Sequence, residues 1–492
     1  MSSQRRHTLL SVGLATLLAV GLLWRPVLSM SDGLWGPQDP WTNGDFIGAY
    51  WLFWSASIPG DATSMLAWPH GEAPLLTSFP NPFDAWLLGP LIAWLPFPLG
   101  WNLMMLGHHL ANVACTVLLA RAAGAKPLPA AAAGALVGAC PVMLYETMLG
   151  HTLTAAVWPG LLGLTLLLRG RGLWAGVLIG IQGLCYLYTG LAFGLAALIL
   201  RPDKRLLSAL VVIAPYLAVL VPMLPAAEAS GPPDGHTSLP LDGLVWASDQ
   251  QHLRLHPVLI AGLLAPLWLP KAQRRQGWRW TGVAVLALVL ALGPTVAWTR
   301  GTGLFTSPVA WIQHLVPGMG RMHHPIRTAM LLAPALAVGV ALALGRWPRV
   351  AGALCLLAAL PAWQTIDNTC AWPEPGQPPG AEHARVLAGT EGAVVDLGSR
   401  SMEALALQPI HGMPILSGLH PRSNPRPGIS PALAQRVNAW AQGKPQPGLP
   451  AALRSQGFTH VLVVDRGPRS PVDSSAVEAA LGPPIHEGVY AL

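Results

Sequence analysis

A cluster of cationic side chains precedes one of the apolar runs of the sequence. Residues 320–327 include Arg321, His323, His324 and Arg327. An arginine guanidinium can donate two parallel hydrogen bonds to a phosphate group. Ionised groups at a membrane boundary are costly unless they have a partner. The segment is therefore expected to bind a lipid phosphate or diphosphate. The alternative is that these side chains only extend back to the membrane surface.

Acidic residues form a second group of candidates near the start of the chain. Asp45 follows a glycine and precedes five aromatic residues within ten positions, a pattern that suggests an interfacial amphipathic helix. A carboxylate there is a candidate for catalysis. It could equally be an N-cap that the helix dipole stabilises. Asp39 has the same two interpretations.

A third group lies at the end of the apolar run Leu128–Met148. Glu146 and His151 close that run, and ionisable groups at the end of a span are candidates for function when they face a cavity. Alternatively, each only ends a helix at the membrane surface. His108 and His109 lie within another apolar run, and at least one is expected to pack against a neighbouring helix.

The composition shows what kind of fold must position these groups. Hydrophobic residues make up 52% of the chain, charged residues make up 10%, and the mean hydropathy is +0.46. Soluble domains carry about 25% charged residues. The chain is therefore expected to be an α-helical polytopic membrane protein. The net charge of +7 does not indicate nucleic-acid binding, because many basic residues cluster in short loops between apolar runs.

The distribution of basic residues predicts the topology. Residues Pro26–Ala120 contain no lysine or arginine, as is typical of a translocated segment. Later basic clusters follow every second apolar run. We expect about eleven transmembrane helices, with the N-terminus in the cytoplasm and the C-terminus outside. The run Leu173–Leu200 is interrupted around Tyr186–Gly190 and is expected to form two short or kinked spans. Residues Ala85–Leu95 are expected to form a re-entrant or interfacial helix.

The composition changes after residue 371. A linker rich in proline and glycine leads to two short β-branched runs, Ala393–Leu397 and His460–Val464, which predict buried strands. Ser430–Gln442 is helix-like. The predicted division is a transmembrane domain of residues 1–371, with its first extracytoplasmic loop at 30–100, and a small extracytoplasmic α/β domain of residues 372–492.

Several short motifs along the chain resemble those of bacterial polytopic membrane glycosyltransferases of the GT-C superfamily, close to its large uncharacterised membrane-protein group. The motifs are Gly44-Asp45, Trp101-Asn102-Leu103, Gly150-His151, a segment with Pro317, Gly318, Arg321, Pro325 and Arg327, and a tail stretch with Gln408, His411-Gly412, Pro414, Gly418 and Arg422. The acidic motif of the superfamily is often a pair of carboxylates, whereas no acidic residue adjoins Asp45.

The resemblance implies an activity and a location. It implies a hexosyl or pentosyl transferase with a GT-C-like fold in the bacterial cytoplasmic (inner) membrane. Such an enzyme moves a sugar from a polyprenyl-phosphate donor to an envelope glycan, lipid or protein on the outer face. The donor enters from the bilayer, and the C-terminal domain shapes access of the acceptor.

The resemblance also implies roles for the candidate residues. Asp45 would be the general base on the acceptor hydroxyl or a ligand for a divalent cation, Mg or Mn, and Asp39 is the second catalytic candidate. Stabilising the charge on the leaving phosphate is the role of a cationic cluster. The expected substrate-binding residues are Arg321, His323, His324, Arg327, His151 and Glu146.

Two other functions use the same features. A transporter or flippase of a lipid-linked sugar would bind the phosphate without breaking a bond. Transporters often show internal repeats and carry charged residues along a path at the middle of the membrane. The sequence shows no repeat and few such charges. A non-catalytic membrane scaffold of the same fold is the third candidate, because a fold does not determine an activity.

Overall fold

The structure is a computed structural model, and most of the chain is described in it. Between residues 30 and 95 it describes only positions 30, 47, 50, 51, 54, 55, 65, 81, 83, 84, 89, 94 and 95. Elsewhere it describes residues 3–28, 99–220, 239–244, 255–299, 303–315, 325–357, 378–397, 401–416, 430–464 and 472–492.

The internal contacts divide the chain into two units. The first unit combines Met1–Gln38 with Pro98–Trp372, and the second combines Asp39–Phe97 with Pro373–Leu492. The predicted division at residue 371, with the first loop in the transmembrane domain, stays a prediction. Hydrogen bonds within the second unit join Trp51 and Met65 to Gln408, more than 300 positions away. The extracytoplasmic placement of both segments stays a prediction.

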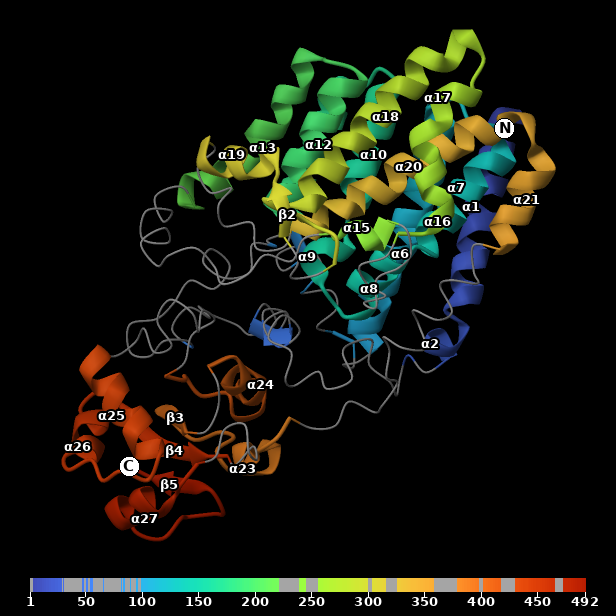
Figure 1. Cartoon of the computed structure of the whole chain (residues 1–492). Coiled ribbons are helices and arrows are strands. Elements are labelled where there is room, and N and C mark those ends of the chain that lie inside the picture. The colour runs from blue at the N-terminus through green and yellow to red at the C-terminus, as the bar shows by residue number, and fades with distance from the viewer. Residues whose placement is uncertain are drawn as a thin grey trace. The chain divides into compact units, whose positions relative to one another are not determined.

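The first unit is built of apolar helices (Figure 1). Its N-terminal half contains α1 (Ser3–Leu22), α2 (Trp24–Leu28), α6 (Leu99–Ala122), α7 (Pro127–Gly138), α8 (Pro141–Met148), α9 (Thr152–Ala155), α10 (Trp158–Leu168), α11 (Gly172–Cys185), α12 (Leu187–Leu200) and α13 (Ser208–Leu220). Its C-terminal half contains α15 (Leu241–Leu244), α16 (Pro257–Ile260), α17 (Ala265–Trp268), α18 (Lys271–Leu292), the strands β1 (Thr295–Ala297) and β2 (Gly303–Thr306), α19 (Pro308–Leu315), α20 (Ala329–Ala343) and α21 (Pro348–Leu357). Short 3₁₀ turns are η4 (Lys204–Leu207), η7 (Ala261–Leu264), η9 (Pro325–Thr328) and η10 (Leu344–Arg346).

Two described helices are long and apolar enough to cross a membrane. They are α6 and the continuous helical segment Pro325–Arg346, and α7 with α8 makes a third if that bent pair is one span. The expected total of about eleven spans stays a prediction. Every residue of α20 is buried, and α20 packs on α18, α7 and α6. A helix that is apolar all round is expected in the interior of a bundle.

Two interruptions shape the region where the polar residues gather. Pro141 begins α8 after Cys140, and α8 is bent from α7 by 53°. A proline is compatible with the first turn of a helix, but it disfavours a helical conformation in the residue before it. The second interruption is Tyr186, which is extended between α11 and α12, so the predicted break in Leu173–Leu200 is confirmed. A Cβ on Gly190 would lie 2.4 Å from the Cα of Gly183, so these glycines allow the two helices to meet closely.

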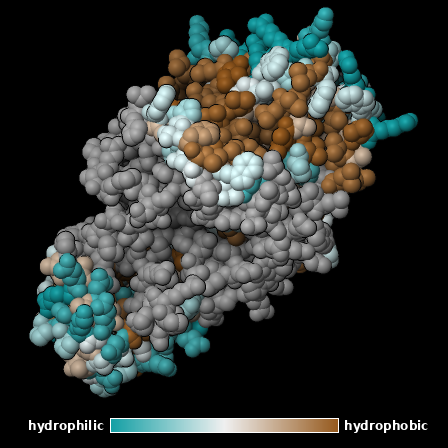
Figure 2. Space-filling model, viewed as in Figure 1, coloured by the Kyte–Doolittle hydropathy of each residue, from teal (hydrophilic) through white to brown (hydrophobic). Residues whose placement is uncertain are grey.

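The outer surface of the helices is apolar. Figure 2 shows hydrophobic side chains, in brown, over the helical unit and hydrophilic side chains, in teal, at one end of it. Exposed residues include Leu173, Trp174 and Leu210. Helices that face lipid are expected to have such a surface, because the bilayer core offers no hydrogen-bonding partners.

The second unit contains a small mixed sheet with helices packed on it. Its described elements are α23 (Ala381–Val386), β3 (Ala393–Leu397), α24 (Ser401–His411), α25 (Pro431–Ala441), α26 (Leu449–Arg454), β4 (Phe458–Val463), α27 (Ser475–Leu481) and β5 (Val489–Ala491). The strand order is β3-β4-β5, with β4 parallel to β3 and antiparallel to β5. The predicted strand Ala393–Leu397 is confirmed as β3. The predicted strand His460–Val464 is β4, which begins two residues earlier.

The predicted helix Ser430–Gln442 is α25. The Ser430 hydroxyl accepts the N–H of Leu433, and Pro431 occupies the first turn, so both residues favour a helix start at this point. Trp440, near the end of α25, is fully buried, and its indole N–H donates to the Ala476 carbonyl at 3.0 Å. Trp440 belongs to the same apolar cluster as Val395 of β3 and anchors the helix on the sheet.

Candidate active site

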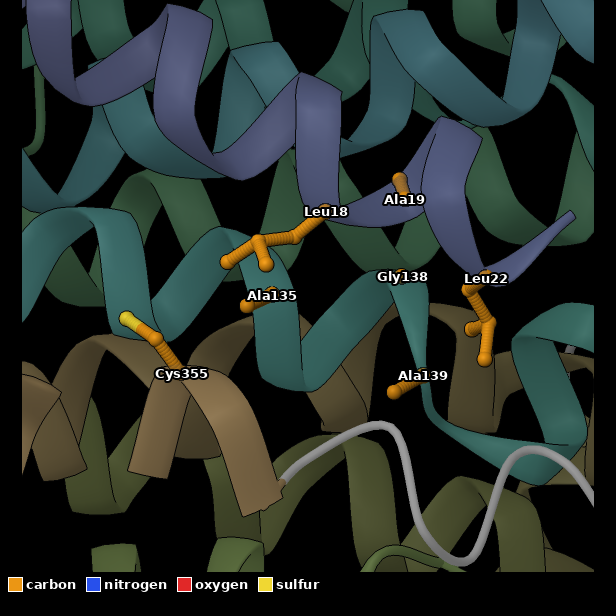
Figure 3. Close-up of a pocket in the computed structure, with 7 residues that line it drawn as sticks. All are labelled: Leu18, Ala19, Leu22, Ala135, Gly138, Ala139 and Cys355. Carbon is orange, nitrogen blue, oxygen red and sulfur yellow. The ribbon is translucent and has the colours of Figure 1, made fainter. Parts of the chain in front are cut away.

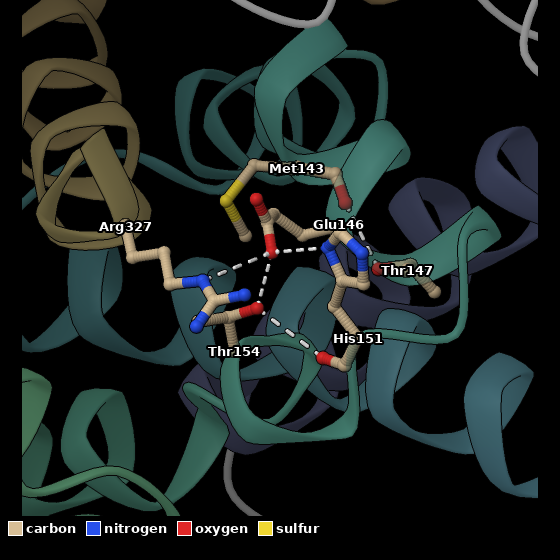
Figure 4. Close-up of polar contacts among 6 residues, drawn as sticks. All are labelled: Met143, Glu146, Thr147, His151, Thr154 and Arg327. Atoms are coloured by element: carbon tan, nitrogen blue, oxygen red, sulfur yellow. Dashed lines mark hydrogen bonds and ion pairs between the residues drawn. The ribbon is translucent and has the colours of Figure 1, made fainter. Parts of the chain in front are cut away.

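The first residue of the site is Glu146, in the last turn of α8. Its side chain is nearly buried, with 5% of the residue exposed. One carboxylate oxygen, Oε2, lies 3.0 Å from Nδ1 of His151 and accepts a hydrogen bond from the Thr154 hydroxyl (Figure 4). A buried carboxylate is stable only when paired and hydrogen-bonded, and Glu146 has both kinds of partner.

A tight turn brings His151 back to Glu146. The backbone N–H of His151 donates to the Glu146 carbonyl at 3.0 Å, and Gly150 between them has a φ of +72°. A Cβ on Gly150 would lie only 2.5 Å from Cζ2 of Trp101. The position therefore needs glycine for its backbone conformation and for the close approach of the indole ring. The Trp101 and Gly150-His151 motifs, which are separate in the sequence, are in contact here.

The cation of the site comes from a distant part of the chain. Arg327 lies in η9, at the start of α20, and only 7% of the residue is exposed. Its Nε atom lies 4.0 Å from Oε2 of Glu146. Its guanidinium carbon lies 5.7 Å from the centre of the Tyr186 ring, a distance within cation–π range. The interruption between α11 and α12 therefore supplies one wall of the site.

Buried amides fix the helices around this cluster. Asn112 of α6 donates to the Ala155 carbonyl at 2.6 Å and accepts the N–H of Val157 at 3.1 Å. Gln182 of α11 donates to the Ala156 carbonyl and the Thr189 hydroxyl, both at 3.0 Å. These bonds satisfy the backbone where α9 ends and α10 begins, and so hold the turn that carries Thr154.

Three donor groups converge on one oxygen of the buried Glu146 carboxylate. His151, Thr154 and Arg327 all direct donors at the same oxygen of Glu146. A carboxylate held by donors in this way fixes their positions and partly neutralises the buried guanidinium. Glu146 thus orients Arg327, and a guanidinium at the start of a helix suits an anionic ligand.

The structure brings together three of the eight predicted site residues. Glu146, His151 and Arg327 form one cluster, and their role in substrate binding stays a prediction. The other five lie outside the described residues, and their roles stay predictions: Asp39, Asp45, Arg321, His323 and His324. Nearby, Nδ1 of His108 accepts the indole N–H of Trp158 at 3.2 Å, and His109 is buried against α7.

Four residues of the region were missed from the sequence: Thr154, Tyr186, Asn112 and Gln182. Asn112 and Gln182 carried a usable signal, because an amide within an apolar helix commonly bonds to a neighbouring helix. Thr154 and Tyr186 carried none, since their types are common in such segments.

The described residues offer no metal-binding group. No three His, Cys, Asp or Glu side chains among them are arranged to hold a metal ion, and Oε2 of Glu146 already has three donors directed at it. A small pocket between α1, α7 and α21 is lined by apolar side chains and the Cys355 thiol (Figure 3). That pocket contains no acid–base group, so it is no candidate for the active site.

One family model matches part of the chain. Residues 81–248, which include Glu146 and His151, match the model of glycosyltransferase family 87. No curated protein matches the sequence.

The solved structures of one arabinofuranosyltransferase share the fold of this chain. The chain resembles the arabinofuranosyltransferase AftD from Mycobacteria with a TM-score of 0.55 and 17% identity, over 98% of this chain and 37% of that chain. A mutant of AftD gives a TM-score of 0.55 and 16% identity, over 97% and 38%. The Archaeoglobus fulgidus oligosaccharyltransferase in the apo form gives 0.48 and 13%, over 92% and 69%. This chain thus spans less than two fifths of the length of AftD.

Proposed function

We propose that this protein moves a sugar from a polyprenyl-phosphate donor to an acceptor on the extracytoplasmic side of the membrane. The observation that carries the proposal is the buried guanidinium of Arg327, held by Glu146 and Tyr186 at the start of α20. An ionised pair inside an apolar bundle is costly to keep and is a candidate for function by default, and a guanidinium paired through its Nε atom has further N–H groups for an anionic ligand. A lipid phosphate, which reaches the bundle from the bilayer, is such a ligand.

The reaction follows from the charges. The acceptor hydroxyl attacks the anomeric carbon of the sugar, and the bond from that carbon to the phosphate oxygen breaks. The oxygen and the bonding electrons leave with the polyprenyl phosphate. Arg327, with Arg321 and His323 or His324, would stabilise the negative charge that builds on this phosphate. Direct displacement of this kind inverts the configuration at the anomeric carbon.

Asp45 would take the proton that the acceptor hydroxyl loses. A general base must lie within hydrogen-bonding distance of that proton in the bound complex. Asp39 is the second candidate. Asp45 would alternatively be a ligand for Mg or Mn, which would help to hold the donor phosphate.

The remaining residues and segments have supporting roles. Glu146 and His151 would keep the Arg327 side chain in its binding orientation. The C-terminal residues 372–492 would lie outside the cytoplasm and shape access of an envelope glycan, lipid or protein acceptor. The N-terminus would lie in the cytoplasm, as the distribution of basic residues predicts.

A transfer assay tests the proposal. The purified protein is reconstituted with a polyprenyl-phosphate sugar and a lipid or glycan acceptor, and the glycosylated product is measured. Asp45→Asn and Arg327→Ala are expected to reduce product formation at least a hundredfold, the order of effect seen when a group that stabilises transition-state charge is removed. Arg349→Ala, at an exposed arginine of α21, is the matched control and should leave the rate unchanged. Full activity in both site variants overturns the proposal.

A further inference from the structure

Gln408 of α24 is fully buried and binds three distant parts of the second unit. Its Oε1 atom accepts the indole N–H of Trp51. Its amide nitrogen donates to the carbonyl of Met65 at 2.6 Å and to that of Met413 at 3.0 Å. All the hydrogens of the amide are used, and two of the three partners belong to the first loop.

The neighbouring backbone joins the same loop. The N–H of Ile415 donates to the Met65 carbonyl at 3.0 Å. Ile415 also forms a parallel bridge with Val394 of β3, so residues 414–416 lie along the open edge of the sheet. Met65 thus receives donors from the Gln408 side chain and from this edge.

A histidine shapes the turn between Gln408 and this edge. Nδ1 of His411 accepts the N–H of Met413 at 3.0 Å, and Gly412 has a φ of +70°. The turn presents the Met413 carbonyl to Gln408 and the Ile415 N–H to Met65. Gln408 therefore binds the first loop, and His411 and Gly412 shape the turn that supplies the second donor to Met65.

The held segment lies next to the candidate catalytic carboxylate in the sequence. Ile47 and Trp51 are both fully buried. Asp45 comes two residues before Ile47 in the chain. Whatever fixes Trp51 therefore limits where Asp45 can lie.

We propose that Gln408 is a positioning residue, which binds Trp51 and the Met65 carbonyl to the C-terminal part of the second unit and so limits the position of Asp45, which precedes Trp51 by six residues. The inference rests on the proposed function, because it assigns Asp45 the role of base. Gln408 touches no substrate in this account; it acts on the reaction through the first loop.

Hydrogen exchange of the full chain tests the attachment without any activity. In Gln408→Ala, amides in peptides covering residues 47–65 and 413–416 should exchange about tenfold faster, the equivalent of one lost buried hydrogen bond. Gln435→Ala, at an exposed glutamine of α25, is the matched control. Unchanged exchange in Gln408→Ala overturns the inference.

Two milder variants separate the two halves of the amide and guard against loss of folding. Gln408→Glu keeps the acceptor for Trp51 but loses both donors, so exchange should increase around Met65 more than around Trp51. Trp51→Phe keeps the ring and loses the N–H, so the reverse order is expected. Equal effects at both places in both variants would contradict this assignment of contacts.

Kinetics then separate positioning from a merely structural role. In folded Gln408→Glu and Trp51→Phe, kcat should fall about tenfold while KM for the donor stays within about twofold, because the phosphate site belongs to other residues. The double variant Gln408→Ala with Trp51→Phe should fall no further than Gln408→Ala alone, since Gln408→Ala has already lost the bond that Trp51→Phe removes. If the losses of kcat in the two single variants multiply in the double variant, the positioning role is wrong. An unchanged kcat together with faster exchange also overturns it.

A different result would overturn the proposed function. If the wild-type protein binds the donor and forms no product, the proposed function is wrong, and hydrogen exchange alone then tests whether Gln408 holds the first loop.

Discussion

The Nε atom of Arg327 lies 4.0 Å from Oε2 of Glu146, although the two residues come from opposite halves of the helical unit. His151 and Thr154 donate to the same oxygen. One carboxylate therefore organises a cation, an imidazole and a hydroxyl within the bundle. The consequences of this arrangement can be measured separately from catalysis.

Removal of the Glu146 charge should destabilise the helical unit. Glu146→Gln removes the carboxylate charge that faces the buried guanidinium of Arg327, and breaking a buried pair from one side costs about 3 kcal/mol. Thermal unfolding of the purified protein in detergent checks this loss. Glu487→Gln, at an exposed carboxylate, is the control and should change the stability by less than about 0.5 kcal/mol.

Restoring neutrality should recover part of that stability. In the double variant Glu146→Gln with Arg327→Met, both charges of this pair are removed, and the protein should be more stable than Glu146→Gln alone. If the double variant is less stable by the sum of the two single losses, Glu146 and Arg327 are not coupled and the pairing is wrong.

Gly150 should not tolerate a side chain. Gly150→Ala forces a residue with a Cβ to adopt a φ of +72° and drives that atom against Trp101, so we expect a loss of about 3 kcal/mol. Gly124→Ala is the matched control, because its φ is +95° but no atom lies within 4 Å of the added Cβ. That variant should lose only about 1 kcal/mol. Unfolding midpoints compare the two, and equal losses would exclude the contact with Trp101 as the cause.

The second unit should lose stability in mild acid because of His411. Burial lowers the pKa of His411 from 6.5 to about 4, and Nδ1 must stay unprotonated to accept the Met413 N–H. Below pH 6.5 His411 becomes protonated in the unfolded chain, whereas in the folded chain it stays neutral until about pH 4. The free energy of unfolding therefore decreases as the pH falls through this window, by about 3 kcal/mol in total, and this histidine contributes no change above it.

The measurement is the unfolding free energy between pH 4 and pH 7. His411→Gln should flatten the dependence on pH, while His486→Gln, at an exposed histidine, should leave the slope as it is. A wild-type slope that persists in His411→Gln would assign the acid sensitivity to other groups.

Local patterns in the sequence predicted several elements well. A run of β-branched residues is a short-range signal, and it placed β3 at its exact residues. The break between α11 and α12 was predicted close to Tyr186. Glu146, His151 and Arg327 were each predicted as substrate-binding residues from their positions at the ends of apolar runs.

Tertiary contacts account for what the sequence did not reveal. The contact of Arg327 with Glu146 depends on how α20 packs against the end of α8, and neither segment carries a sign of the other. The bond between Gln408 and the Met65 carbonyl joins residues 343 positions apart. A glutamine in a helix has the same local appearance whether it faces water or a distant carbonyl, so only the folded chain identifies its partner.

The central claim is that Arg327 holds the phosphate of a lipid-linked sugar donor while the sugar is transferred. The most direct test is product formation in proteoliposomes with a radiolabelled polyprenyl-phosphate sugar, comparing wild-type protein, Arg327→Ala and the control Arg349→Ala. The account predicts labelled acceptor with the wild type and the control, and at least a hundredfold less with Arg327→Ala. Equal amounts of product from all three proteins would contradict the role of Arg327. Labelled donor that crosses the bilayer without transfer of its sugar would contradict the proposed transfer reaction.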